Sequence, residues 1–175
     1  MGDANSLNYS DLTEKDVDEV VAFMAKHFYP REPISTGLHM TYEDNKEWIH
    51  GSVRDWVKNG VSVVAREPDT KAVAGTIIAT ILTRDQSNTY EQALTSPKTK
   101  ESERRGRLFG CTLATAQATA VPSQRLLYRL GYESLYTLDY ATFEIAGDRV
   151  FDMDKMLGTP SAKVMARLID ESVDK

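Results

Sequence analysis

The sequence predicts an α/β (α+β) protein with a mixed, mostly antiparallel central sheet flanked by helices. Two segments repeat apolar residues at helical spacing, and several short β-branched runs are separated by turn residues. The length of 175 residues, with 41% hydrophobic and 27% charged residues, suits one domain with its own core. We therefore expect residues 1–175 to form a single domain.

The first third of the chain predicts one strand and two helices. Residues 7–10 form the strand, and the first helix starts at Thr13, which with Asp16 matches a variant of the capping box. The second helix covers residues 41–59 and ends at Gly60, a common helix stop. Its expected buried stripe consists of Trp48, Ile49, Ser52, Val53, Trp56 and Val57.

The middle of the chain contains both strand-like and polar segments. The β-branched runs 61–65 and 73–82 predict a hairpin across the turn sequence Glu-Pro-Asp-Thr-Lys. Residues 84–107 are polar with little apolar periodicity, which indicates a loop or a frayed helix around residues 89–94. The small apolar residues of 112–121 then predict a buried strand.

The last third of the chain predicts two helices and a hairpin. Pro122 opens a helix that ends at Gly131, since proline is tolerated in the first turn of a helix. Residues 132–143 predict a long strand, and the turn Ala-Gly-Asp leads into a short strand at 149–151. A final helix is expected from Ser161, with Val164, Leu168 and Ile169 on its inner face.

Charge and composition argue against several kinds of partner. A net charge of −5 disfavours nucleic acid, although it would weakly attract a cationic small molecule. No apolar run approaches the roughly 20 residues that span a bilayer, and the N-terminus lacks the apolar segment of a signal peptide, so no membrane partner is expected. The single cysteine, Cys111, suits a reducing, cytoplasmic location. His27, His39 and His50 lack metal-ligand spacing, and no metal is expected.

Three ordered segments carry a family resemblance. Phe-Tyr-Pro-Arg-Glu-Pro-Ile at 28–34 follows the first predicted helix, and Gly-Cys-Thr at 110–112 begins a stretch that closes on Leu-Gly-Tyr at 130–132. The third segment, Tyr-Thr-Leu-Asp-Tyr at 136–140, leads to the hairpin at 150–151. In this order they resemble the insect and nematode arylalkylamine branch of the GCN5-related N-acetyltransferase (GNAT) superfamily. The resemblance implies a GNAT-like sheet and transfer of an acetyl group from acetyl-CoA to a primary amine.

The resemblance implies roles for a carboxylate and a hydroxyl. Glu32 matches the general base of the family, although an exposed loop carboxylate without a role is the alternative. Ser123 matches a serine at the start of a helix near the thioester sulfur, where it could assist the leaving thiolate or orient water; alternatively, it satisfies a free N–H group of the helix. The tyrosine acid of many members is replaced by Leu127, and Tyr128 lies about 100° away on the helix.

An arylalkylamine acceptor also requires an apolar slot. Phe28, Tyr29 and His39 lie near Glu32 in the sequence and are expected to contact the amine. Thr119, four residues before Ser123, falls where the family often has a second serine. Trp48 could contribute to the slot, but its helical spacing with Trp56 favours a position in the core.

The expected cofactor-binding region is short. In the family a strand, a glycine-containing turn and a long helix, together called motif A, bind the CoA pyrophosphate through backbone N–H groups. Residues 84–110 are too few for these elements, so we expect the usual fourth strand and third helix to be lacking and a sheet edge to be exposed at 112–119. The remaining candidates for binding acetyl-CoA are Arg104, Arg105, Gly106, Arg107, Gly110 and Gln124.

Two functions follow from these observations. The first is an acetyl-CoA-dependent N-acetyltransferase for a small-molecule amine, expected to be an arylalkylamine, with Glu32 as base. The second is a non-catalytic GNAT-like domain that has lost CoA binding and acts as a binding or interaction module. A monomer or a weak homodimer is expected in either case.

Overall fold

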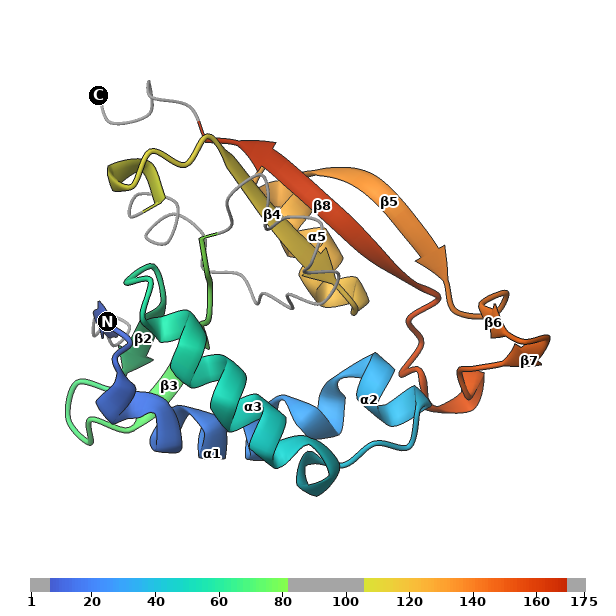
Figure 1. Cartoon of the computed structure of the whole chain (residues 1–175), viewed down its shortest axis with the longest axis horizontal. Coiled ribbons are helices and arrows are strands. Elements are labelled where there is room, and N and C mark those ends of the chain that lie inside the picture. The colour runs from blue at the N-terminus through green and yellow to red at the C-terminus, as the bar shows by residue number, and fades with distance from the viewer. Residues whose placement is uncertain (1–6, 82–105, 170–175) are drawn as a thin grey trace, which may run out of the picture.

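The structure, a computed structural model, describes residues 7–81 and 106–169, which form two halves (Figure 1). The N-terminal half consists of β1 (Asn8–Asp11), η1 (Glu14–Asp16), α1 (Val17–His27), η2 (Tyr29–Arg31), α2 (Pro33–Gly37), α3 (Tyr42–Val57), β2 (Val63–Arg66) and β3 (Val73–Ile77). The C-terminal half consists of β4 (Leu113–Ala118), α5 (Val121–Arg129), β5 (Glu133–Asp139), β6 (Glu144–Ile145), β7 (Asp148–Arg149), η3 (Met153–Lys155) and β8 (Ser161–Leu168).

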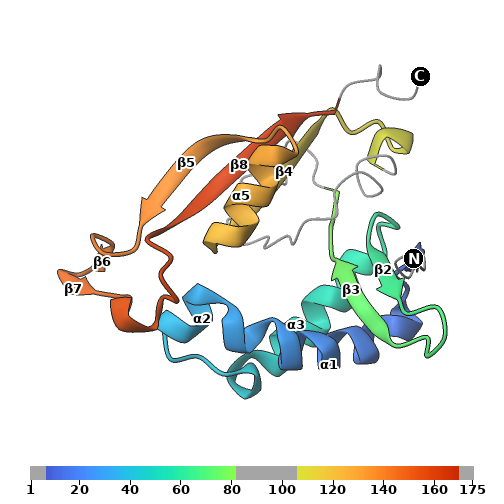
Figure 2. The ribbon, with the colours of Figure 1, turned by 180° about the vertical axis from the view of Figure 1, so that it is seen from behind.

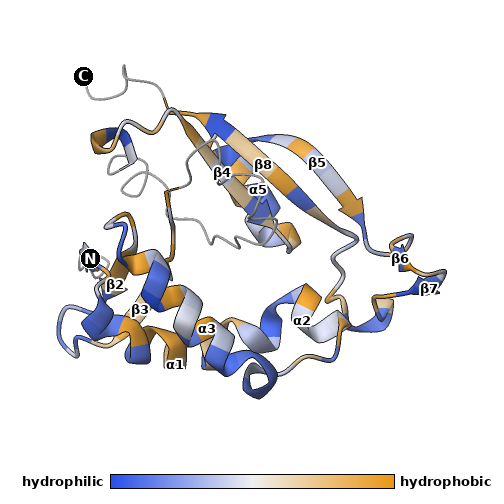
Figure 3. Ribbon diagram, in the orientation of Figure 1, coloured by the Kyte–Doolittle hydropathy of each residue, from blue (hydrophilic) through white to orange (hydrophobic). Residues whose placement is uncertain are grey.

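The N-terminal half is an antiparallel sheet, in the order β1-β2-β3, packed against α1 and α3. The predicted strand and helices are confirmed, and local hydrogen bonds explain where the helices start. The Asp16 carboxylate accepts bonds from the backbone N–H and hydroxyl of Thr13 at 2.9 and 2.7 Å. The Asp44 carboxylate repeats this pattern with Thr41 at 2.7 and 2.6 Å. The apolar faces of the helices meet in a core of Leu12, Val17, Val20, Val21, Ile49, Val53, Val57, Val64 and Ile78 (Figure 3).

The buried stripe predicted for α3 is wrong at one tryptophan. Ile49, Val53 and Val57 are buried as expected, but Trp48 is 51% exposed and Trp56 is only partly buried. Trp48 lies one residue before Ile49, so a rotation of about 100° places it beside the core. The two indole rings pack edge to face with 6.3 Å between their centroids.

The C-terminal half is a second antiparallel sheet, in the order β4-β8-β5, with α5 on one face (Figure 2). The predicted strand at 112–121 and the predicted helix after Pro122 are confirmed as β4 and α5. The long strand predicted at 132–143 is shorter, because the Asp139 carboxylate accepts bonds from the N–H groups of Ala141 and Thr142 and the chain turns. The core between sheet and helix consists of Ala116, Ala118, Leu127, Tyr132 and Met165.

The helix predicted from Ser161 is wrong, because this segment forms β8, the central strand of the second sheet. Val164 pairs with Gln117 on β4 and with Tyr136 on β5. These partners lie more than 25 residues away, so the local sequence does not contain them, and tertiary pairing overrides helix propensity.

The described sheets fit the predicted α+β class, and every strand pair among the described residues is antiparallel. The prediction that the fourth strand and third helix are missing concerns residues 84–110, of which only 106–110 are described. Residues 106–108 are helical and Gly110 has a positive φ of 75°. Within the described ranges, β3 and β4 each have one neighbouring strand, so each is an edge strand of its sheet.

The two halves are connected through α2 and η3. The Thr36 hydroxyl donates to the Lys155 carbonyl at 2.7 Å, and the Asp152 N–H donates to the Gly37 carbonyl at 2.9 Å. Gly37 has no side chain at a point where the Met156 sulfur occupies the position of a Cβ. This contact fixes α2, which carries Glu32 at its start.

Candidate active site

A cavity of about 570 Å³ lies between the two halves. One wall comes from α1, η2, α3 and β3, and the other from the end of β4 and the start of α5. This volume lies within the range of about 300–1,000 Å³ that is typical of small-molecule sites. A junction between two packed parts of a fold is also a common position for such a site.

Aromatic rings form much of the N-terminal wall. Phe28 and Tyr29 pack edge to face with 5.6 Å between ring centroids, and Trp48 packs against Trp56 in the same manner. All four residues line the cavity, together with Phe23. Ring edges and faces at these angles provide a surface on which another aromatic ring can pack.

Glu32 lies in the cavity wall and is only 3% exposed, so it is not an exposed loop carboxylate. Its carboxylate caps α2: Oε1 accepts from the Ile34 N–H at 3.1 Å, and Oε2 accepts from the Ser35 N–H and hydroxyl at 2.6 and 2.8 Å. Pro33 at the first helical position has no N–H that needs a partner. A carboxylate offers about four acceptor positions, so three bonds leave one position on Oε1.

The partly buried Tyr29 and the buried Tyr140 both interact electrostatically with Glu32. Burial and the negative charge of Glu32 raise the pKa of Tyr29 to about 12, with a smaller effect from Tyr42. The same two causes raise the pKa of Tyr140. The Tyr140 hydroxyl donates to the Thr119 carbonyl at 3.1 Å, which fixes the end of β4 next to the cavity. Both phenols are therefore protonated and uncharged at neutral pH.

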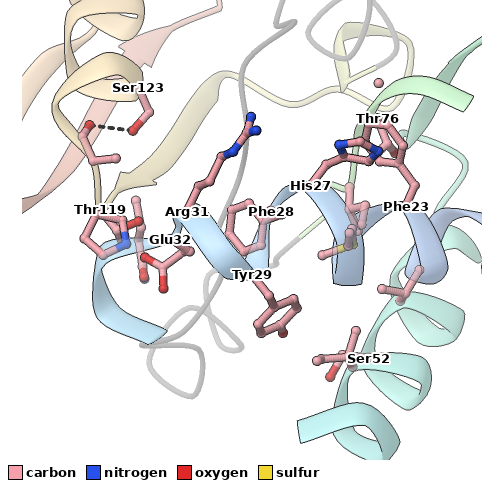
Figure 4. A pocket seen from close by; sticks show the side chains of 18 of the residues that line it. Phe23, His27, Phe28, Tyr29, Arg31, Glu32, Ser52, Thr76, Thr119 and Ser123 are labelled. Carbon is pink, nitrogen blue, oxygen red and sulfur yellow. Dashed lines mark hydrogen bonds between the residues drawn. The ribbon is translucent and has the colours of Figure 1, made fainter. Parts of the chain in front are cut away.

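The two predicted hydroxyl residues line the same cavity but differ in their bonds (Figure 4). The Ser123 hydroxyl donates to the Ala120 carbonyl at 2.7 Å, rather than serving a free N–H group. Thr119 is 7% exposed, and its hydroxyl has no hydrogen-bond partner among the described residues. The Thr119 hydroxyl can therefore donate to a bound molecule as it stands, whereas the Ser123 hydroxyl must first rotate away from the Ala120 carbonyl.

Two predicted site residues serve other contacts. His39 does not line the cavity; its exposed ring lies 3.1 Å from the Asp152 carboxylate. Its φ of 55° belongs to a turn after α2, which directs the chain away from the cavity. Gln124 is buried, and its amide donates to the carbonyls of Ala118 and Ser161 at 3.2 and 2.6 Å. Gln124 thus joins α5 to β4 and β8.

The other candidates for binding acetyl-CoA lie away from the cavity or outside the described residues. Arg104 and Arg105 are outside them. Gly106, Arg107 and Gly110 are described, and none of them lines the cavity. No cluster of histidine, cysteine or acidic residues that could hold a metal occurs in the described ranges. None of the helices in these ranges is long and apolar enough to cross a membrane.

The cavity wall also contains residues that sequence reasoning missed. Trp56 lines the cavity, although its helical spacing with Trp48 favours a position in the core. Arg31 also lines the cavity, although the sequence assigns no role to this residue directly before Glu32. The signal for Arg31 is the pair of flanking prolines, which favour a short, fixed turn. In the structure this turn is η2, and it presents Arg31 and Glu32 to one cavity.

The chain shares its fold with solved N-acetyltransferases. Arylalkylamine N-acetyltransferase 2 from Aedes aegypti matches with a TM-score of 0.77 at 17% identity, over 95% of this chain and 100% of that chain. An agmatine N-acetyltransferase in its apo form matches with a TM-score of 0.73 at 16% identity, over 93% of this chain and 99% of the other. The polyamine N-acetyltransferase of Drosophila melanogaster, which forms N-acetylagmatine, matches with a TM-score of 0.71 at 16% identity. The match covers 93% of this chain and 100% of that chain.

These similarities confirm the GNAT-like fold that the sequence resemblance implied. No family model matches the sequence, and no curated protein gives a significant match.

Proposed function

We propose that the protein is an N-acetyltransferase that transfers an acetyl group from acetyl-CoA to a primary arylalkylamine. The observation that carries this proposal is the buried carboxylate of Glu32 in the wall of an aromatic cavity, on a fold shared with amine N-acetyltransferases. An amine needs a base before it can attack, and its aromatic body needs an apolar wall. The cavity contains both.

Glu32 serves as the general base in this proposal. Its free acceptor position on Oε1 binds the substrate ammonium directly or through one water, and takes a proton as the N–C bond forms. The bonds from Ile34 and Ser35 hold the carboxylate in place, which keeps the base oriented before the substrate arrives. Phe28 and Tyr29 contact the aromatic body of the amine.

The hydroxyls on the opposite wall assist the acyl group. Acetyl-CoA supplies the acetyl group as a thioester, whose carbonyl oxygen gains negative charge during attack and whose sulfur leaves as a thiolate. The free Thr119 hydroxyl can donate to the oxyanion or orient water. Ser123, after rotation away from Ala120, can donate to the thiolate. The cavity is lined by β3 on one side and β4 on the other, so an extended acyl arm can lie between the two walls.

A turnover assay tests the proposal. Purified full-length protein is mixed with acetyl-CoA and 2-phenylethylamine, and both N-acetyl product and free thiol are measured. We expect equal amounts of product and thiol, in proportion to protein and time. If titration with millimolar acetyl-CoA neither raises the unfolding temperature nor yields product, the chain is the non-catalytic relative instead, since a bound ligand must stabilise the folded state.

A further inference from the structure

A single unpaired cation lies in the described part of the cavity wall. Arg31 lines the cavity and its side chain is exposed. Its guanidinium makes no ion pair or hydrogen bond within the described ranges, whereas Arg54 and Arg66 both pair with carboxylates there. In Figure 4 the Arg31 side chain extends between Ser123 and Phe28, and its guanidinium points away from the Glu32 carboxylate. Its backbone is held by the η2 turn, in which its N–H donates to the Phe28 carbonyl.

The charged side chains of the cavity wall are few. Among the described residues that line it, Arg31 and Glu32 are the one arginine and the one acidic residue, and His27 is the one histidine. Glu32 can receive one ammonium group at its free acceptor position. A second positive charge on the same acceptor would find no further carboxylate in the described wall, and Arg31 would repel it.

From this charge arrangement we infer that Arg31 is a specificity-determining residue that disfavours dicationic acceptors. The cavity accepts an amine with one ammonium group and an apolar body, and discriminates against agmatine and polyamines, which carry a second cation. This inference deepens the proposed function and rests on it. It also separates this chain from two of the proteins that share its fold, which act on agmatine and polyamines by their names.

The expected effect is moderate, because Arg31 is exposed and water and salt screen its charge. Removal of the charge in Arg31→Gln should improve the affinity for agmatine relative to 2-phenylethylamine about threefold. Reversal of the charge in Arg31→Glu should improve this ratio about tenfold, with most of the gain lost at about 0.5 M salt. Lys26→Gln is the matched control, because Lys26 is an exposed cation of α1 outside the cavity wall.

The experiment measures dissociation constants of both amines by calorimetry at about pH 8, where histidine is ordinarily neutral. Acetylation rates of both amines are measured in parallel. The inference is supported if Arg31→Glu shifts the ratio about tenfold towards agmatine and Lys26→Gln leaves it unchanged. It is overturned if the ratio moves less than about twofold in Arg31→Glu, or moves equally in Lys26→Gln, while 2-phenylethylamine is still acetylated. If wild-type protein neither binds nor acetylates either amine, the proposed function fails as well.

Discussion

The two halves of the molecule differ in how completely they bury their apolar residues. In the N-terminal half, α1 and α3 cover the sheet and nine residues form a buried core. In the C-terminal half the core has five buried residues, two of them alanines, under the single helix α5. Large apolar side chains remain exposed there at Leu108, Phe109, Leu113, Leu135, Tyr136 and Leu168. Among the described residues, the C-terminal half therefore has the smaller apolar core, although it supplies one wall of the cavity.

The largest expected effect tests the small C-terminal core. Leu127 is 1% exposed and is the principal aliphatic residue of α5 in that core. Leu127→Ala should lower the free energy of unfolding by about 3 kcal/mol, because it leaves a cavity that small alanine neighbours cannot fill. Chemical denaturation measures this change. Leu135→Ala, at a side chain that is 66% exposed, is the control and should change stability by less than about 0.5 kcal/mol. Similar losses in both variants would contradict the description of this core.

A smaller effect is expected at the aromatic wall of the N-terminal half. Phe28→Ala removes a ring that lines the cavity but is only partly buried itself. We expect the KM for 2-phenylethylamine to rise about tenfold, which corresponds to about 1.4 kcal/mol of lost apolar contact, with kcat nearly unchanged. Steady-state kinetics measure both values. Phe143→Ala, in the C-terminal half and outside the cavity wall, is the control. An equal rise in KM for both variants would show that Phe28 does not contact the amine.

The smallest expected effect concerns how the free energy of unfolding changes at acid pH, and it involves Asp16 of the N-terminal half. Burial opposes ionisation of Asp16, but hydrogen bonds from Thr13 and the pairing with Arg66 outweigh it and lower the pKa of this carboxyl below 3.8. A lowered folded-state pKa contributes stability above the unfolded value, and this contribution is lost as the pH falls through the folded value. Unfolding measured between about pH 6 and pH 3 should therefore show a shallower acid loss in Asp16→Asn than in wild type.

Asp69→Asn, in the exposed loop between β2 and β3, is the control for this comparison. In this variant the free energy of unfolding should fall with pH as steeply as in wild type. If Asp16→Asn keeps that slope as well, the contact at 2.8 Å between Asp16 of η1 and Arg66 of β2 does not stabilise the folded state.

The parts of the fold that depend on local contacts could be predicted from the sequence. Thr13 with Asp16, and Thr41 with Asp44, fix two helix starts within three residues of chain. β8 could not be predicted, because its identity depends on β4 and β5, which are distant in the sequence.

The candidate site was predictable where resemblance and local chemistry agreed. Glu32, Phe28, Tyr29, Thr119 and Ser123 all line one cavity. His39 is near Glu32 in the sequence, but the positive-φ turn after α2 carries it to Asp152 instead of the cavity. The sequence could not place Arg31 and Trp56, because their roles depend on how η2 and α3 face the C-terminal half.

The central claim is that Glu32 deprotonates the amine in the cavity between the two halves. Single-turnover acetylation of 2-phenylethylamine at about pH 7 tests it directly, with wild type compared with Glu32→Gln and acetyl-CoA affinity measured for both. The amide oxygen that this substitution introduces can still accept from Ser35, whereas its NH2 group cannot accept from the Ile34 N–H, so the variant should lose about 1–2 kcal/mol of stability. We predict that the rate falls by at least about 100-fold while acetyl-CoA affinity stays within about threefold. A folded Glu32→Gln protein that acetylates the amine at the wild-type rate would contradict the account.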